Sequence, residues 1–150
     1  MSRTVLPIRT IDEASFAPYG DVLDFTSTKP SDEGAFGRFQ IITRSEDPTG
    51  WRLALLRFSN RECRRLEQHP SSKESFEPVS GVSLLFLAVP GHPEQVEAFL
   101  LDRPVCLNEG VWHDVVALSQ SAVVKIAENL NVESEIIELE RPWAPRVVAE

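Results

Sequence analysis

The sequence is poor in several features, and each shortage excludes a class of protein. Only two cysteines, Cys63 and Cys106, stand among 150 residues. They form no CxxC pair, which excludes a disulfide-stapled minidomain and a zinc ribbon. No apolar run approaches the ~18 residues of a membrane-spanning helix. The N-terminal residues also lack the apolar stretch of a signal peptide, so we expect a cytoplasmic protein with no membrane partner.

Positive charge is also scarce. The chain has 15 Lys and Arg against 23 Asp and Glu, which gives a net charge of −8. Nucleic acid repels such a chain, so we expect no nucleic-acid partner. The length fits a single domain over residues 1–150 that can bury a core without disulfides or a metal. A cytoplasmic enzyme and a small-molecule-binding domain remain.

Short apolar and β-branched runs separated by turn residues dominate the chain, and none keeps a helical period over three turns. A single helical turn is expected over Glu13–Phe16, capped by Asp12 and ended by Pro18. Thr28–Gly37 reads as a loop. So many short strands predict a β-sandwich, jelly roll or barrel. The expected strands are Val5–Ile11, Asp21–Thr26, Phe39–Thr43, Trp51–Phe58, Cys63–His69, Ser75–Val79, Ser83–Val89, Val96–Leu101, Val105–Leu107, Val115–Leu118, Ala122–Ala127 and Glu135–Leu139.

Residues with chemical potential gather around one histidine. Glu67 and His69 are two residues apart, so they face the same way on a strand. Glu74 follows after four intervening residues, and Gly81 comes at the end of the next expected strand. This spacing resembles the first metal-binding motif of the cupin superfamily. His113, in a Gly-Val-Trp-His run, resembles part of the second motif.

These residues support two kinds of chemistry. Glu67, His69, Glu74 and His113 form a mixed nitrogen and oxygen ligand set for a divalent metal, and Ni, Mn, Fe and Zn all remain open. Without a metal, His69, Glu74 and His113 would act as general acid and base. The plainer alternative is a hydrogen-bonded histidine at a strand end beside an exposed turn carboxylate.

Three motifs resemble one family, the ureidoglycolate lyases. Residues 69–70 with 76–78 and Gly81 resemble that family's E-R-H-P…F-x-P…G region. Residues 111–114 resemble its W-H-H element, and residues 16–22 resemble its F-x-x-Y-G-D-V opening. The resemblance implies a cupin-like β-barrel, also called a double-stranded β-helix or jelly roll, with at most one or two short helical turns. It also implies a homodimer, and cleavage of ureidoglycolate into glyoxylate and urea in allantoin and purine catabolism.

A small-molecule carboxylate substrate calls for a cation, and arginine matches it best. We expect Arg57 to bind it, because Arg57 shares a strand face with Trp51 and Leu55 and would point into an apolar interior. Arg38 is the second candidate. Lys73, on the turn within the first motif, is the third.

Departures from the family pattern keep two alternatives open. Asp114 stands where the family has its second histidine, Gln68 where it has an arginine, and Glu74 where it has a glutamine. Another metal-dependent cupin enzyme acting on a small hydroxy or oxo acid would fit these changes. So would a cupin that binds a small acid without turnover.

Two features fit the expected homodimer. Ser83–Val89 is apolar on both faces, which is typical of a central strand covered on each side. The C-terminal tail, Arg141–Glu150, is expected to be extended, and its Trp143 would dock on the body or on a second subunit.

Overall fold

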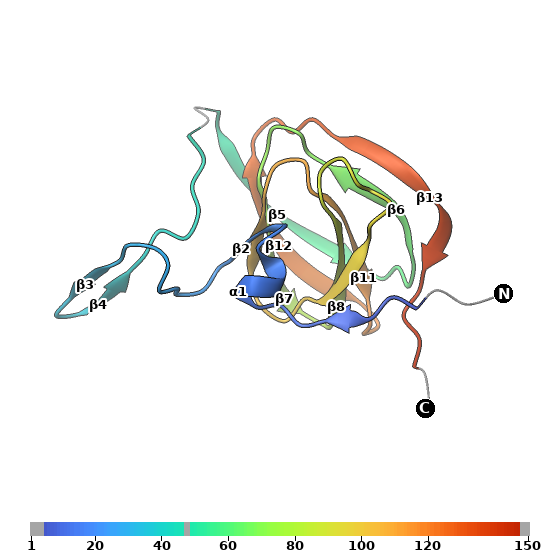
Figure 1. Ribbon diagram of the computed structural model, residues 1–150, viewed down its shortest axis with the longest axis horizontal. Coiled ribbons are helices and arrows are strands. Elements are labelled where there is room, and N and C mark those ends of the chain that lie inside the picture. The colour runs from blue at the N-terminus through green and yellow to red at the C-terminus, as the bar shows by residue number, and fades with distance from the viewer. Residues whose placement is uncertain (1–4, 47–48, 148–150) are drawn as a thin grey trace.

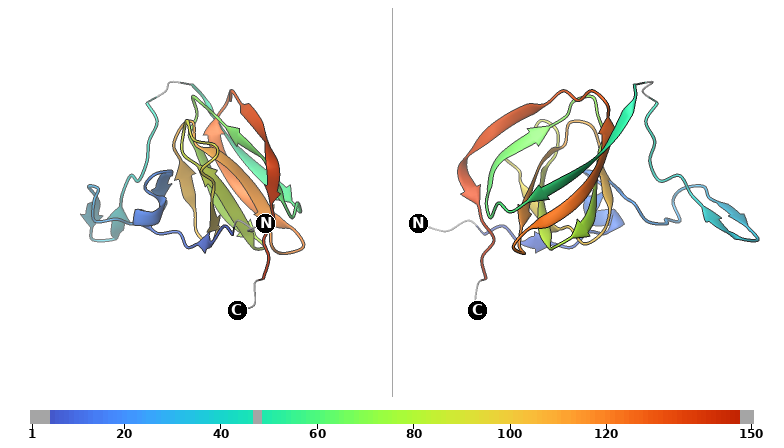
Figure 2. Two further views of the ribbon diagram at one scale, coloured as in Figure 1. Left: turned by 45° about the vertical axis from the view of Figure 1, so that its right-hand side comes forward. Right: turned by 180° about the vertical axis from the view of Figure 1, so that it is seen from behind.

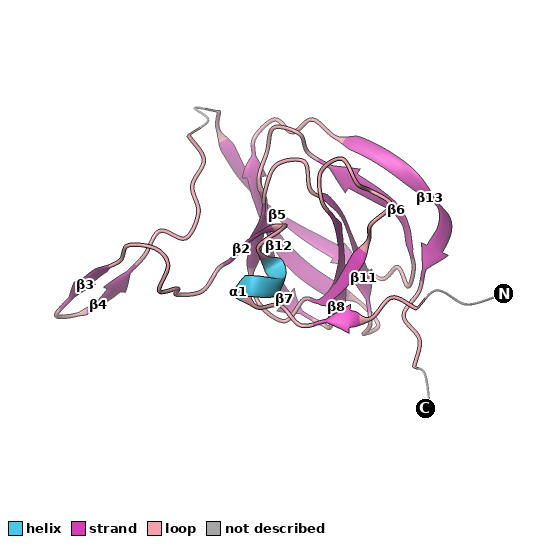
Figure 3. Ribbon diagram, in the orientation of Figure 1, coloured by secondary structure: helices cyan, strands magenta, loops and turns pink. Residues whose placement is uncertain are grey.

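Short strands make up nearly all of the regular structure. The computed structural model describes residues 5–46 and 49–147, and strands dominate it (Figure 3). The expected all-β class is therefore confirmed. The described residues contain one helix, which spans four residues and is too short to cross a membrane. The elements are β1 (Ile8–Arg9), α1 (Glu13–Phe16), β2 (Gly20–Val22), β3 (Asp32–Gly34), β4 (Gly37–Phe39), β5 (Trp51–Phe58), β6 (Cys63–Gln68), β7 (Glu74–Ser80), β8 (Ser83–Ala88), β9 (Glu97–Leu100), β10 (Val105–Leu107), β11 (Trp112–Ala117), β12 (Ala122–Asn129) and β13 (Glu135–Trp143).

Two sheets face each other and form a barrel. One has six strands in the order β1-β9-β8-β11-β6-β13, and the other has five in the order β2-β10-β7-β12-β5. Figure 1 and the two views in Figure 2 show these sheets as one body, with the β3–β4 hairpin projecting away from it. Strand β5 is the last strand of its sheet, so one of its edges has no neighbour within the sheet.

The main core fills the space between the sheets. Phe76 and Val124 come from the five-stranded sheet, and Leu85 and Val115 come from the six-stranded sheet. All four are buried. Alternation along each strand sends every second side chain inward, so any polar residue in an inward register faces the barrel interior.

A second core lies on the other face of the six-stranded sheet. On β8, Leu85 belongs to the main core while its neighbours Leu84 and Phe86 belong to the second one. This explains why the strand is apolar on both faces, as predicted. Leu6 and Trp143 pack against the second core from the two ends of the chain. Both faces of β8 are thus covered from within one chain, so neither β8 nor Trp143 requires a second subunit.

The predicted helical turn at α1 is confirmed, whereas the loop and strand predicted for the segment after β2 are wrong. Asp12 accepts a hydrogen bond from the Ser15 amide, and the Ser15 hydroxyl accepts one from the Asp12 amide, forming a capping box. The loop expected at Thr28–Gly37 instead contains β3 and the start of β4, and the expected strand Phe39–Thr43 keeps only Phe39. The hairpin is small and local, and its glycines read as loop residues in the sequence.

The turn between β7 and β8 depends on Gly81. Its φ is +75°, and an added Cβ would lie 2.3 Å from the Ser121 carbonyl oxygen. Gly91 has a similar φ of +81° but open space around it. We expect Gly91→Ala to cost roughly 1 kcal/mol for the backbone alone, and Gly81→Ala roughly 2–4 kcal/mol because the clash adds to it. Urea denaturation of both variants measures the difference, and equal losses would contradict the clash.

Candidate functional site

Polar side chains from both sheets lie close together inside the barrel. In the six-stranded sheet, His113 of β11 pairs in register with Glu67 of β6, and His69 follows directly after β6. In the five-stranded sheet, Glu74 of β7 pairs with Glu128 of β12. The sheets face each other, so residues distant in sequence meet between them.

The three residues predicted to be catalytic are in direct contact. Oε2 of Glu74 lies 3.0 Å from Nε2 of His69 and 2.9 Å from Nε2 of His113. Each of the three residues is only 6% exposed. A single carboxylate oxygen therefore bridges two imidazole rings in a nearly dry environment. The plainer alternative, in which Glu74 is an exposed turn residue, is wrong.

Backbone carbonyls fix the orientation of both rings. Nδ1 of His69 lies 3.1 Å from the carbonyl oxygen of Glu133, and Nδ1 of His113 lies 2.9 Å from that of Val111. A carbonyl only accepts hydrogen bonds, so each Nδ1 carries a hydrogen. Each Nε2 then faces Glu74 with a lone pair or with an added proton. A favourable contact with the carboxylate requires that proton or a cation in its place.

Charge coupling within the trio shifts all three pKa values. Burial acts to lower the pKa of His69 and His113, but the hydrogen bonds and negative charge of Glu74 outweigh it and raise both above the usual 6.5. Burial acts to raise the pKa of Glu74, but the two imidazoles outweigh it and hold the value at about 2. At neutral pH Glu74 is a carboxylate, and the rings are able to hold a proton.

The donor set also fits a divalent cation. One nitrogen or oxygen donor from each of Glu67, His69 and His113 lies within 4.8 Å of the others, and the same holds for His69, Glu74 and Glu128. Oε2 of Glu74 and Oε2 of Glu128 are buried and accept no hydrogen bond when the histidines are neutral. A metal ion would satisfy these oxygens and the Nε2 lone pairs together. Each of the four predicted ligands belongs to one of these two groups, which share His69.

Sequence reasoning missed two members of the cluster, Glu128 and Arg52. Glu128 has a side chain only 8% exposed, and it binds Arg52 through Oε1. One signal was present for Glu128. It continues the inward-facing series Ala122, Val124 and Ile126 of β12, so its carboxylate ends an apolar stripe. Arg52 offered no comparable signal, because both stripes of β5 are largely apolar.

The expected burial of Arg57 is wrong. Leu56 and Phe58 pair with the core residues Val124 and Ala122, so their stripe faces the barrel. Arg57 lies on the opposite stripe and is exposed, as is Trp51 at 70%. The structure therefore does not bring Arg57 to the histidines.

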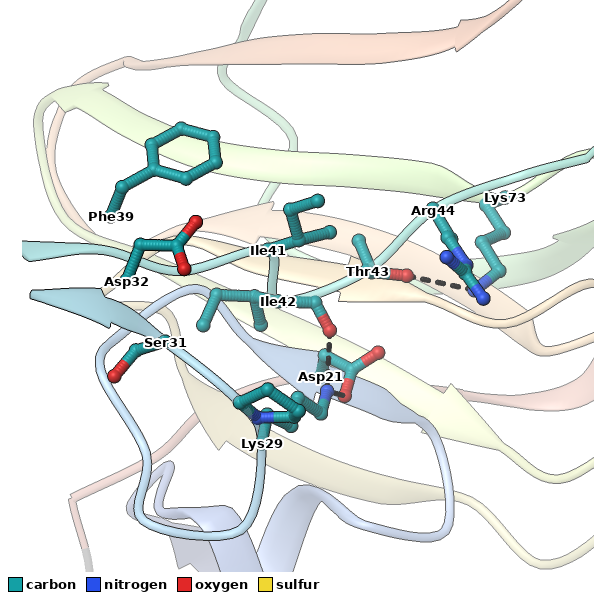
Figure 4. Close-up of a pocket in the computed structure, with 11 residues that line it drawn as sticks. Asp21, Lys29, Ser31, Asp32, Phe39, Ile41, Ile42, Thr43, Arg44 and Lys73 are labelled. Atoms are coloured by element: carbon teal, nitrogen blue, oxygen red, sulfur yellow. Dashed lines mark hydrogen bonds and ion pairs between the residues drawn. The ribbon is translucent and has the colours of Figure 1, made fainter.

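Neither Lys73 nor Arg38 joins the cluster within one chain. Lys73 donates to the Thr43 hydroxyl and lines a separate pocket of about 550 Å³ beside the arm that carries the hairpin (Figure 4). Arg38 lies on the projecting hairpin, where it stacks on Phe25 and pairs with Glu33 at 3.5 Å. The three predicted cations thus occupy three other places.

Two solved structures share this fold. A dTDP sugar isomerase from Desulfovibrio desulfuricans G20 aligns with a TM-score of 0.50 at 15% identity, covering 75% of this chain and 82% of that one. CapF aligns with a TM-score of 0.52 at 14% identity, covering 77% and 36%. The two-sheet barrel, with histidine and glutamate donors inside it, belongs to the class of cupin-like folds. Within that class, the chain belongs to the ureidoglycolate lyase family, which matches residues 3–144.

Curated relatives agree with this family. The ureidoglycolate lyase of Azotobacter vinelandii is 31% identical over 130 residues, covering 75% of this chain and 76% of the relative. That of Rhizobium etli (strain CIAT 652) is 28% identical over 132 residues, covering 78% and 80%. The family resemblance stated from the sequence motifs is therefore confirmed.

Proposed function

We propose that this protein is a ureidoglycolate lyase, an enzyme that splits ureidoglycolate into glyoxylate and urea. The observation that carries the proposal is the contact of two imidazole Nε2 atoms with one buried Glu74 oxygen. Family membership supports the same reaction. Glu74 and Asp114 depart from the family motifs, and the acid–base reaction described below uses neither a glutamine nor a third histidine.

The reaction needs one proton removed and one added. Ureidoglycolate carries a hydroxyl and a urea nitrogen on the same carbon. The hydroxyl loses its proton, its oxygen forms the carbonyl of glyoxylate, and the carbon–nitrogen bond breaks with its electron pair moving to nitrogen. That nitrogen takes up a proton and leaves as part of urea. No water is consumed, so a base and an acid beside one carbon are sufficient.

His69 and His113 supply the base and the acid. Because carbonyls hold both Nδ1–H groups, Nε2 is the atom on each ring that exchanges protons. A neutral ring accepts the hydroxyl proton, and a protonated ring donates to the departing nitrogen. Glu74 stabilises whichever ring is charged. With a raised pKa, each ring is protonated more readily near neutral pH than a free imidazole.

A divalent metal is the second component of the proposal. Glu67, His69, Glu74 and His113 would hold it, together with Glu128. When bound, such an ion polarises the substrate hydroxyl and carboxylate. The protein side chains would still orient the substrate and exclude water, because the histidines and Glu74 are almost entirely buried.

We place this activity in the cytoplasm, in allantoin and purine catabolism, with a small carboxylate as the partner and no nucleic acid or membrane. We also propose a homodimer. The outer stripe of β5 supports a second copy, because Trp51, Leu53 and Leu55 are 58–71% exposed on an edge strand. An apolar edge of that length invites pairing with another chain.

A product assay tests the proposed function. Purified protein is incubated with racemic ureidoglycolate, and glyoxylate, urea and ammonia are quantified with and without a chelator. We expect equal amounts of glyoxylate and urea from one enantiomer and no ammonia above the spontaneous background. Loss of activity with the chelator would establish the metal. Product at only the background rate would reject the lyase, and release of ammonia would indicate a hydrolase instead.

A further inference from the structure

One arginine enters the cluster from the edge strand of the barrel. Arg52 of β5 pairs in register with Glu128 of β12, and Glu128 pairs with Glu74 of β7. The three side chains therefore form a row across three neighbouring strands on one face of the sheet. Glu74 marks that face as the interior, because its carboxylate contacts both histidines.

The hydrogen bonds of Arg52 fix its guanidinium group and leave some of its N–H groups available to a ligand. Nε and Nη2 donate to the same Glu128 oxygen, at 3.0 and 2.7 Å. A guanidinium has five N–H groups, so this contact uses two and leaves up to three for a ligand. The Arg52 side chain is 47% exposed, whereas that of Glu128 is 8% exposed. The cation thus sits between buried acid and solvent, where an incoming anion would meet it.

Glu128 connects this cation to the catalytic trio. Its second oxygen, Oε2, is buried without a hydrogen bond and lies 3.9 Å from Nε2 of His69. One carboxylate therefore fixes Arg52 with one oxygen and faces His69 with the other. A ligand bound to Arg52 would lie beside the rings that exchange protons.

An anionic substrate needs this cation. With neutral histidines, the three carboxylates Glu67, Glu74 and Glu128 and the single guanidinium of Arg52 give the cluster a charge of −2. Among the residues that the structure describes, Arg52 is the one lysine or arginine with an ion pair to these carboxylates. A substrate carboxylate is otherwise repelled from the barrel.

The geometry points to Arg52 as the residue that binds the substrate carboxylate, with Glu128 as its positioning residue. This inference rests on the proposed function and adds to it a recognition site for α-hydroxy and α-oxo carboxylates at the barrel edge. The planar fork of arginine matches a carboxylate with two parallel hydrogen bonds. A substrate held there by its carboxylate presents its hydroxyl-bearing carbon toward His69 and His113.

The experiment compares Arg52→Gln and Arg52→Lys with a matched control, Arg64→Gln. Arg64 lies on β6, is exposed, and pairs with Glu62, so its loss removes one arginine–glutamate ion pair at the surface, outside the cluster. Turnover of ureidoglycolate gives kcat and KM, calorimetric titration with glyoxylate gives Kd, and thermal unfolding gives Tm. Urea, which carries no charge, serves as a second ligand.

We expect Arg52→Gln to raise KM and the glyoxylate Kd by about 10- to 100-fold, because the substrate carboxylate loses a hydrogen-bonded partner of opposite charge. The kcat and the inhibition by urea would change far less, whereas Tm would fall because the buried Glu128 carboxylate loses its partner. Arg52→Lys would recover part of the affinity, because it restores charge without the fork. Arg64→Gln would match the wild type in all four measurements.

The outcomes separate this inference from the proposed function. Arg52→Gln with unchanged KM and glyoxylate Kd but lowered Tm would make the Arg52–Glu128 pair purely structural and overturn the inference. A wild-type protein that binds glyoxylate through Arg52 without cleaving ureidoglycolate would reject the lyase and keep the carboxylate site. A wild-type protein that binds no glyoxylate would overturn the site even if turnover occurs.

Discussion

Replacing His113 with alanine is expected to lower kcat for ureidoglycolate by about 1,000-fold or more, in the upper range for a lost general acid or base. The ring has no substitute, because Nε2 of His113 is one of two imidazole atoms on the Glu74 oxygen. If a metal is bound, the same change removes a ligand. Either role predicts the same loss, measured as initial rates of glyoxylate formation.

The matched control is His92→Ala. His92 is exposed on the turn between β8 and β9, pairs with Glu94, and belongs to neither group of candidate metal ligands. It should keep wild-type kcat. Circular dichroism and thermal unfolding would show that His113→Ala still folds. A folded His113→Ala protein with full activity would remove the residue from the site.

Stability of the metal-free protein is expected to peak between about pH 4.5 and 6.5. The folded pKa of Glu74 is about 2 against a usual 4.5, so its contribution is present above 4.5 and is lost as pH falls toward 2. The folded pKa values of His69 and His113 lie above 6.5, so their contribution is present below 6.5 and is lost as pH rises through those raised values. Tm across pH 3–9, with a chelator present, measures both arms.

A bound metal should offset the loss of stability that the metal-free protein shows above pH 6.5. A cation competes with protons for both Nε2 atoms and the Glu74 oxygen, so binding strengthens as pH rises. Adding Mn²⁺, Ni²⁺, Fe²⁺ or Zn²⁺ should therefore raise Tm more at pH 8 than at pH 5.5. Equal shifts at both values would place the ion outside this cluster. No shift with any of the four would leave His69, Glu74 and His113 as a proton-sharing trio alone.

The contact among His69, Glu74 and His113 was predictable in part because most of its signals are local. Glu67 and His69 sit two apart on one strand, and Glu74 begins the next, so spacing alone brings them near each other. His113 required the family motif, since its contact with Glu74 crosses the barrel. The two imidazoles, Glu67 and Glu74 were thus identified, and Glu128 was missed. The geometry of the cluster, including the carbonyl contacts at Nδ1, depends on long-range packing that spacing does not reveal.

The two arginines of β5, Arg52 and Arg57, show where sequence reasoning fails. On β5, one stripe carries Trp51, Leu55 and Arg57, and the other carries Arg52 and Phe58. Both are apolar apart from the arginine, so hydrophobicity does not decide which faces inward, and the larger apolar stripe was the wrong choice. Pairing with β12 decides it, because Phe58 lies beside the core residue Ala122. A one-residue shift in strand register exchanges the two arginines.

The placement of His69 has a consequence for when the enzyme becomes active during synthesis. Its Nδ1 contacts the Glu133 carbonyl and the Ser134 hydroxyl, which lie 64 and 65 residues later and lead into the last strand, β13. A nascent chain that ends before this segment carries the whole motif around His69 but cannot hold the ring. Contacts so distant in sequence form late in folding. We therefore expect catalytic activity only after β13 has left the ribosome and paired with β6.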